Sequence, residues 1–184
     1  SPKTQASLLE AMEEGQVTVD GVSYELPKPF LVIATQNPME FLGTYPLPEA
    51  QMDRFMMRIS VGYPSREEEM KMALQYLQGK TTDTLAPVCT AEDMIELMRE
   101  VEQIQVKEAV IGYVEDLVDL TRQEDSYQYG ISPRGMLALL RGAQAKAFLE
   151  QRDYVKPDDI KSVAESILLH RLTLTSEAKI RKMN

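Results

Sequence analysis

Cysteine is almost absent from the 184-residue sequence, which contains only Cys89. An internal disulfide framework and any metal site built from several cysteines are therefore excluded. Long apolar runs are also lacking: none approaches the roughly 18 residues that span a membrane, and the first residues do not form the apolar segment of a signal peptide. We therefore expect a cytoplasmic protein with no integral membrane segment.

Positive charge is scarce as well. The sequence has 20 Lys and Arg against 29 Asp and Glu, a formal net charge of −9. This balance disfavours a broad footprint on a phosphate backbone, and we expect no nucleic-acid partner. The single histidine, His170, is interpreted as part of a helix end, and the acidic residues 67–69 as the start of a helix, so no metal site is predicted.

The first 65 residues have the pattern of an incomplete α/β unit. Residues 4–15 predict a helix, and Asp20-Gly21 between valine-rich flanks predicts a β-hairpin over residues 17–24. The unbroken apolar run 30–34 is typical of a strand that is buried on both faces of a parallel sheet, and residues 55–61 form a second such candidate. Two strands cannot complete such a sheet, so these residues predict part of an α/β domain.

From residue 66 onward the patterns are helical. Apolar spacing, caps and prolines at first helical positions predict five helices, over residues 68–77, from the cap at Thr90, and over 107–122, 133–150 and 157–169. We therefore predict a predominantly helical protein with two parts, a partial α/β core over residues 1–65 and an all-α bundle over residues 66–184.

Three polar residues are candidates for chemistry. Asn37 follows the predicted strand 30–34, where open α/β sheets bind their ligands. Arg54 ends a short predicted helix, and Arg134 lies at the start of the helix over 133–150. Each also has a plain structural interpretation: Asn37 as a turn residue before proline, Arg54 as a solvated or Asp53-paired side chain, and Arg134 as a surface residue.

Taken together, several segments resemble the MoxR-type AAA+ ATPases. The resemblance covers nearly the whole chain, in the order and spacing of that family. It rests on the following segments: 2–5 (Pro-Lys-Thr-Gln), 8–18, 34–38 (Ala-Thr-Gln-Asn-Pro), 43–55, 153–160 and 169–172.

The resemblance implies a role for each candidate. Asn37 matches sensor 1, which orients the attacking water against the γ-phosphate. Arg54 matches the arginine finger, presented to a nucleotide on the neighbouring subunit. Arg134 matches sensor 2, which reaches the phosphates from the helical lid of its own subunit. Asn37 and Arg134 would thus contact the nucleotide. An arginine suits these roles because its guanidinium stays charged and binds phosphate oxygens through a fork of N–H groups.

The family also implies cofactors and partners for the intact protein. These are ATP and Mg²⁺, self-assembly into a ring that is expected to be a hexamer, a partner with a von Willebrand A domain, and protein clients that are remodelled. The hairpin over residues 17–24 resembles the insertion before sensor 1, which commonly faces the central pore or a client.

The sequence departs from the family pattern in three places. No Gly-x-x-x-x-Gly-Lys-Ser/Thr motif occurs, and no apolar strand ending in Asp-Glu precedes Pro2. We expect these Walker motifs to lie before residue 1, and we expect this chain alone to bind no cofactor and to be inactive as an ATPase. Residues 39–42 include bulky apolar side chains where a polar loop is usual, and Gly135 replaces a usual alanine.

Two alternative functions remain open from the sequence. The chain could be a non-catalytic helical module that binds a partner protein. It could also belong to a subunit of a magnesium chelatase or to a relative of the replicative helicases. Residues 44–55 closely resemble the MoxR-type sequence, and the chain is acidic; both features disfavour this last alternative.

Overall fold

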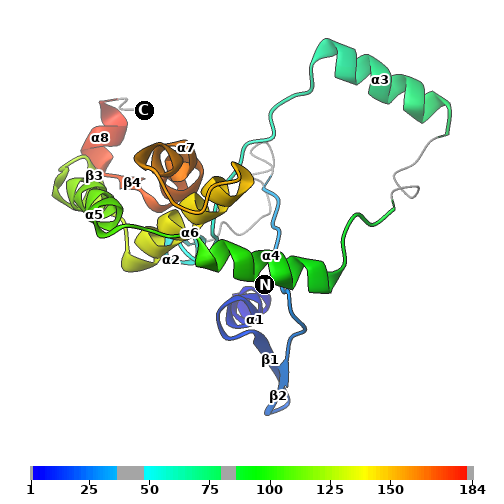
Figure 1. The fold of residues 1–184 in the computed structure, drawn as a ribbon, viewed down its shortest axis with the longest axis horizontal. Coiled ribbons are helices and arrows are strands. Elements are labelled where there is room, and N and C mark those ends of the chain that lie inside the picture. The colour runs from blue at the N-terminus through cyan, green and yellow to red at the C-terminus, as the bar shows by residue number, and fades with distance from the viewer. Residues whose placement is uncertain (1, 37–47, 80–85, 182–184) are drawn as a thin grey trace.

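The structure, a computed structural model, describes residues 2–36, 48–79 and 86–181. Helices predominate, as predicted (Figure 1). None of the helices in the described ranges is both long and apolar enough to cross a membrane. The elements are, in order, α1 (Pro2–Glu14), β1 (Gln16–Val19), β2 (Val22–Glu25), α2 (Glu49–Met52), α3 (Arg66–Leu77), α4 (Ala91–Gln103), α5 (Glu108–Gln123), β3 (Tyr127–Tyr129), α6 (Pro133–Leu149), α7 (Pro157–Leu168), the 3₁₀ helix η2 (Leu169–Arg171), β4 (Thr173–Leu174) and α8 (Ser176–Ile180).

The hairpin predicted around Asp20-Gly21 is confirmed. Strands β1 and β2 pair antiparallel, with Val17 opposite Tyr24. Asp20 and Gly21 at the turn have φ values of 50° and 79°, and this left-handed geometry is one that an Asp-Gly pair accepts at low cost. The hairpin lies beside α1, where the Thr18 hydroxyl donates to the Glu10 carboxylate at 2.8 Å, and its tip points away from the other helices (Figure 1). Val22 and Tyr24 on β2 are exposed.

The two predicted strands of a parallel sheet require a correction. Residues 30–36 and 57–64 contain no strand, and both sheets in the described part of the chain are two-stranded and antiparallel. A β-strand is stabilised by backbone hydrogen bonds to a neighbour, and among the described residues no strand pairs with these runs. Leu31 and Ile33 are accordingly 78% and 81% exposed. The apolar residues 30–34 thus suit an extended, buried segment. They can form a β-strand only where another strand is present to pair with them.

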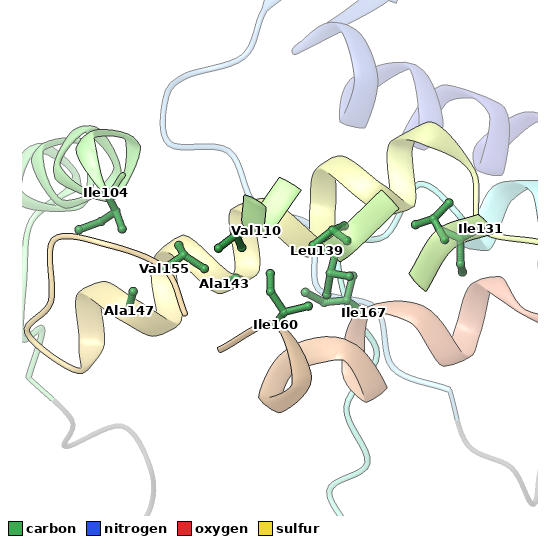
Figure 2. Close-up of a cluster of buried hydrophobic side chains, with 11 residues drawn as sticks. Ile104, Val110, Ile131, Leu139, Ala143, Ala147, Val155, Ile160 and Ile167 are labelled. Atoms are coloured by element: carbon green, nitrogen blue, oxygen red, sulfur yellow. The ribbon is translucent and has the colours of Figure 1, made fainter. Parts of the chain in front are cut away.

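The hydrophobic core lies where α5, α6 and α7 meet (Figure 2). Val114 on α5, Leu139 on α6, and Ile160 and Ile167 on α7 are completely buried. Gly142 allows α6 to approach α7 closely, because a Cβ at this position would lie 2.4 Å from Cδ1 of Ile167. The helical part therefore has a core of its own.

The helices begin where the sequence provides caps. Ser65 and Thr90 form capping boxes at the starts of α3 and α4. At α6, the Ser132 hydroxyl accepts a hydrogen bond from the Gly135 amide at 3.1 Å, and Pro133 occupies the first turn. The N-terminus of α6 is therefore fixed at Ser132, which sets the position of Arg134.

Helix α3 lies apart from the other elements (Figure 1). It contains no buried residue, although Met70, Leu74 and Leu77 are apolar and lie at helical spacing. Helix α4 likewise has no buried residue. Both helices therefore present apolar side chains that the described part of the chain does not cover.

One buried arginine joins the end of α7 to the segment after α2. The guanidinium of Arg171, whose side chain is 2% exposed, donates hydrogen bonds to the carbonyls of Ile167 at 2.8 Å and Phe55 at 2.7 Å. It also pairs with the Asp53 carboxylate at 2.7 Å. Because these partners come from residues 53–55 and from α7, Arg171 fixes the turn after α2 against the helical bundle.

The neighbouring residue, His170, is buried at the same junction. Its Nε2–H donates to the carbonyl of Phe55 at 3.0 Å, whereas Nδ1 is buried and has no hydrogen-bond partner in the described structure. Burial lowers the pKa of His170 below its ordinary value of 6.5; Arg171 and Arg58 lower it further, while the Phe55 carbonyl and Asp53 act in the opposite direction. The structure therefore favours neutral His170.

We predict opposite effects for alanine at two helical glycines. Gly142→Ala should lower the free energy of unfolding by about 1 to 3 kcal/mol, because its Cβ would overlap Ile167. Gly112→Ala should raise it by up to about 1 kcal/mol, because alanine favours a helix and, apart from its own helix backbone and chain neighbours, no atom of the described residues lies within 4 Å of the added Cβ. Urea unfolding followed by circular dichroism measures both, and equal effects would contradict this account of α6–α7 packing.

We predict that Arg171→Lys lowers the free energy of unfolding by about 2 to 4 kcal/mol, because lysine cannot replace the fork of hydrogen bonds to a carboxylate and several carbonyls. Arg141→Lys is the control. That arginine is 47% exposed and pairs with Glu102 at the surface, so its replacement should cost less than about 1 kcal/mol. Urea unfolding of both variants measures the two changes. Similar losses of unfolding free energy would show that the buried hydrogen bonds of Arg171 stabilise the fold no more than an exposed ion pair does.

We predict that stability rises with pH in the window just below pH 6.5, because the unfolded chain binds a proton on His170 there and the folded chain does not. His170→Gln, which keeps an N–H donor for the Phe55 carbonyl, should flatten this dependence. Thermal unfolding at several pH values between about 5 and 7.5 measures it. The same slope in both proteins would mean that folding does not lower the pKa of His170.

Candidate functional site

The turn after α2 is tied to the start of α6 by Asp53. The Ser132 hydroxyl, which caps α6, donates to the two carboxylate oxygens of Asp53 at 3.1 and 3.0 Å. Arg134 Nη1 lies 3.9 Å from the same carboxylate, and Arg171 pairs with it at 2.7 Å. Asp53 therefore holds the residue that follows it, Arg54, close to the N-terminus of α6.

Arg54 and Arg134 meet at one carboxylate. Arg54 forms an ion pair with Oε2 of Glu13, and Arg134 forms an ion pair with Oε1 of the same residue. The side chains of Arg54, Arg134 and Glu13 are 28%, 47% and 31% exposed. Two guanidinium groups from distant parts of the sequence thus lie side by side at a surface that solvent reaches.

The charges at this cluster are unequal. Glu13 contributes one negative charge against the two positive charges of Arg54 and Arg134. Partial burial acts to raise the pKa of Glu13, but the hydrogen bonds and charges of the two arginines outweigh it and hold the pKa below its ordinary value. Glu13 is therefore ionised at neutral pH, and the group around it keeps an excess of positive charge next to a helix N-terminus, which itself favours anions.

The glycine at position 135, in the first turn of α6, has a local structural reason. A Cβ at this position would lie 2.8 Å from Cγ2 of Ile131 and 3.0 Å from Cδ of Arg171. Glycine therefore leaves room for the buried Arg171 side chain directly beneath the start of α6.

Of the three predicted site residues, the structure brings Arg54 and Arg134 together through Glu13. Asn37 lies outside the described residues. The alternative in which Arg54 pairs with Asp53 is wrong, because Asp53 binds Arg171 and Ser132 while Arg54 binds Glu13. In the described part of the chain no group of three or more His, Cys, Asp or Glu side chains could hold a metal ion.

Three residues of the cluster were not predicted as site residues: Glu13, Asp53 and Arg171. Arg171 could have been noticed as a charged residue among the leucines of residues 168–172, since a charged side chain that is buried with such neighbours requires a partner. Glu13 could have been noticed at the C-terminal end of a predicted helix, where a negative charge is unfavourable.

Two family models match the chain. Residues 1–57 match the model described as "ATPase family associated with various cellular activities (AAA)", and residues 119–183 match the AAA lid domain. Arg54 falls within the first match, and Arg134 and Arg171 fall within the second. The cluster therefore joins residues from both matched regions.

Three curated proteins are similar over nearly the whole chain. The uncharacterized protein YeaC of Bacillus subtilis is 51% identical, over 97% of this chain and 56% of its own length. Chaperone MoxR1 of Mycobacterium tuberculosis is 40% identical, over 96% and 48%. Protein MoxR of Paracoccus denitrificans is 30% identical, over 98% and 59%. The chain thus spans about half the length of the curated relatives it matches.

The fold agrees with a crystal structure from Cytophaga hutchinsonii, provisionally described as that of an ATPase. The two chains superpose with a TM-score of 0.92 at 41% identity, over 100% of this chain and 58% of the other. The sequence expectation of a partial AAA+ core followed by a lid is thereby confirmed, and the chain belongs to the MoxR-type AAA+ ATPase family.

Proposed function

We propose that the full-length protein binds and hydrolyses ATP at the subunit interfaces of a ring and uses this activity to remodel protein clients. The observation that supports this most directly is the meeting of Arg54 and Arg134 at Glu13, beside the N-terminus of α6. In this proposal residues 1–65 are the end of the ATPase core and residues 66–184 are its lid.

The cluster has the chemistry that phosphoryl transfer requires. The transferred group spreads negative charge over its phosphate oxygens, and catalysis depends on placing positive charge around it. Each guanidinium uses one nitrogen for Glu13, which leaves other N–H groups to donate to phosphate oxygens. Both side chains are partly exposed, so a phosphate can reach them.

These residues suit a phosphate and do not suit a metal ion. Mg²⁺ binds carboxylates and water in octahedral geometry, whereas the carboxylates of Glu13 and Asp53 are already paired with arginines. The proposed nucleotide would therefore be held at its phosphates by Arg54 and Arg134. Magnesium, when bound in the full-length protein, would supply further charge compensation at the phosphates.

The arrangement favours one nucleotide for both arginines. The resemblance to the family assigns Arg54 to the nucleotide of a neighbouring subunit and Arg134 to that of its own subunit. Because both side chains of one chain bind the same carboxylate, we propose instead that they serve the same nucleotide, bound on the neighbouring subunit of a ring, which we expect to be a hexamer. Asn37 would act as sensor 1 on the nucleotide of its own subunit.

The relatives and the exposed hairpin support action on proteins. One relative is named a chaperone, and the hairpin presents Val19, Val22 and Tyr24 to solvent. We propose that this hairpin contacts clients, that a protein with a von Willebrand A domain acts together with the ring, and that the ring works in the cytoplasm. The 184-residue chain alone would not hydrolyse ATP.

A second candidate function is a non-catalytic helical module. The observation that favours it is the absence of buried residues in the described helices α3 and α4, whose apolar side chains could bind a partner protein. In that case Arg54 and Arg134 would not affect ATP hydrolysis by the full-length protein.

We predict that Arg54→Ala lowers kcat for ATP in the full-length protein by about 10³-fold or more, as for other arginine fingers, and that Arg134→Ala and Asn37→Ala lower it by about tenfold or more. Arg141→Ala, which removes an exposed arginine far along α6, is the matched control. Steady-state phosphate release measures each rate. Unchanged rates for Arg54→Ala and Arg134→Ala would favour the non-catalytic module.

We also predict how variant subunits combine in mixed rings. A subunit that carries both Arg54→Ala and Arg134→Ala should be complemented by a subunit whose own nucleotide-binding motif is inactivated, because the second subunit supplies both arginines to the intact nucleotide site of the first. Phosphate release at varied mixing ratios measures this. If Arg134 serves the nucleotide of its own subunit, the double variant will not be complemented, whereas Arg54→Ala alone will be.

A further inference from the structure

Glu13 occupies a position that the helix itself does not favour. It lies in the last turn of α1, next to Glu14, and this turn contains no basic residue. A negative charge at a helix C-terminus is destabilising because it faces the negative end of the helix dipole. The contacts of Glu13 outside the helix must therefore account for its charge, and these contacts are Arg54 and Arg134.

The two arginines need an anion between them to stay together. Arg54 and Arg134 are 80 residues apart, on the turn after α2 and on α6. Two guanidinium groups repel each other, and each long side chain gains rotamer freedom when it is released. Glu13 offsets the repulsion by binding one arginine through each carboxylate oxygen.

The rest of the cluster fixes the backbones but not both side-chain ends. Asp53 and Arg171 hold the turn that carries Arg54, and the Ser132 cap holds the helix that carries Arg134. In the described part of the chain, Glu13 is the one residue that forms an ion pair with both Arg54 and Arg134.

From this geometry we infer that Glu13 is a positioning residue for ATP hydrolysis, which holds the guanidinium groups of Arg54 and Arg134 side by side so that both face one phosphate. This inference rests on the proposed function. Glu13 does not touch the nucleotide in this scheme. It acts through the two arginines, and it need not leave them when a phosphate binds, because each guanidinium keeps further N–H donors.

Glu14 provides a matched control. It is the next residue of the same helix end and is exposed, and within the described structure it has no hydrogen bond or ion pair through its side chain. Glu13→Gln and Glu14→Gln therefore remove the same charge from the same helix terminus, and only the first removes the contact with the arginines.

The test is a double-mutant cycle in the full-length protein, with single-turnover hydrolysis of radiolabelled ATP as the measurement. We expect Glu13→Gln to lower the rate about tenfold to hundredfold and Glu14→Gln to leave it within about twofold. In a protein that already carries Arg54→Ala and Arg134→Ala, Glu13→Gln should change the rate less than about twofold, since nothing remains to be positioned. Glu13→Asp, which keeps the charge on a shorter side chain, should give an intermediate rate.

Several outcomes would overturn the inference. These are an equal loss from Glu13→Gln in both backgrounds, a loss that Glu14→Gln reproduces, or an increase in rate on removal of the carboxylate. If Arg54→Ala and Arg134→Ala lower the rate but Glu13→Gln does not, the inference alone fails. If neither arginine affects the rate, the proposed function fails, and the inference about Glu13 fails with it.

Discussion

The arrangement of the site depends on the buried guanidinium of Arg171. A charged side chain that is 2% exposed is tolerated only when its donors are satisfied, and here the Asp53 carboxylate and several backbone carbonyls accept its hydrogen bonds. These acceptors come from α7 and from the turn after α2. The pairing of Arg171 with Asp53 therefore determines how the segment that matches the AAA family lies against the segment that matches its lid.

The surface cluster is built on this buried pair. Asp53 binds both Arg171 and the Ser132 cap of α6. Arg54 follows Asp53 directly, and Arg134 lies two residues after Ser132, so both arginines are within reach of Glu13. Gly135 provides the space that this arrangement needs. The same interactions that join the two regions thus place two cations together at the surface, where an anionic ligand can meet both.

Local features of the sequence predicted much of the fold. The Asp20-Gly21 turn, the cap at Ser132 and the helices with apolar faces are all present, because each depends on neighbouring residues within one element. The strand over residues 30–34 was predicted from the same kind of pattern but is not formed. A strand depends on hydrogen bonds to another strand. A run of apolar residues, or an alternation of apolar and polar ones, does not show whether that partner strand is present.

The sequence by itself determined the family, the helical character of residues 66–184, and the identity of Arg54 and Arg134 as candidates. Only the tertiary structure decided that these arginines share one carboxylate, that Asp53 binds Arg171 in place of Arg54, and that Glu13 belongs to the site. The physical reason is that these ion pairs join residues 41 to 121 positions apart, and such pairs produce no periodic or local pattern in a sequence. They exist only in the folded chain, where the end of α1, the turn after α2, the start of α6 and η2 lie close together.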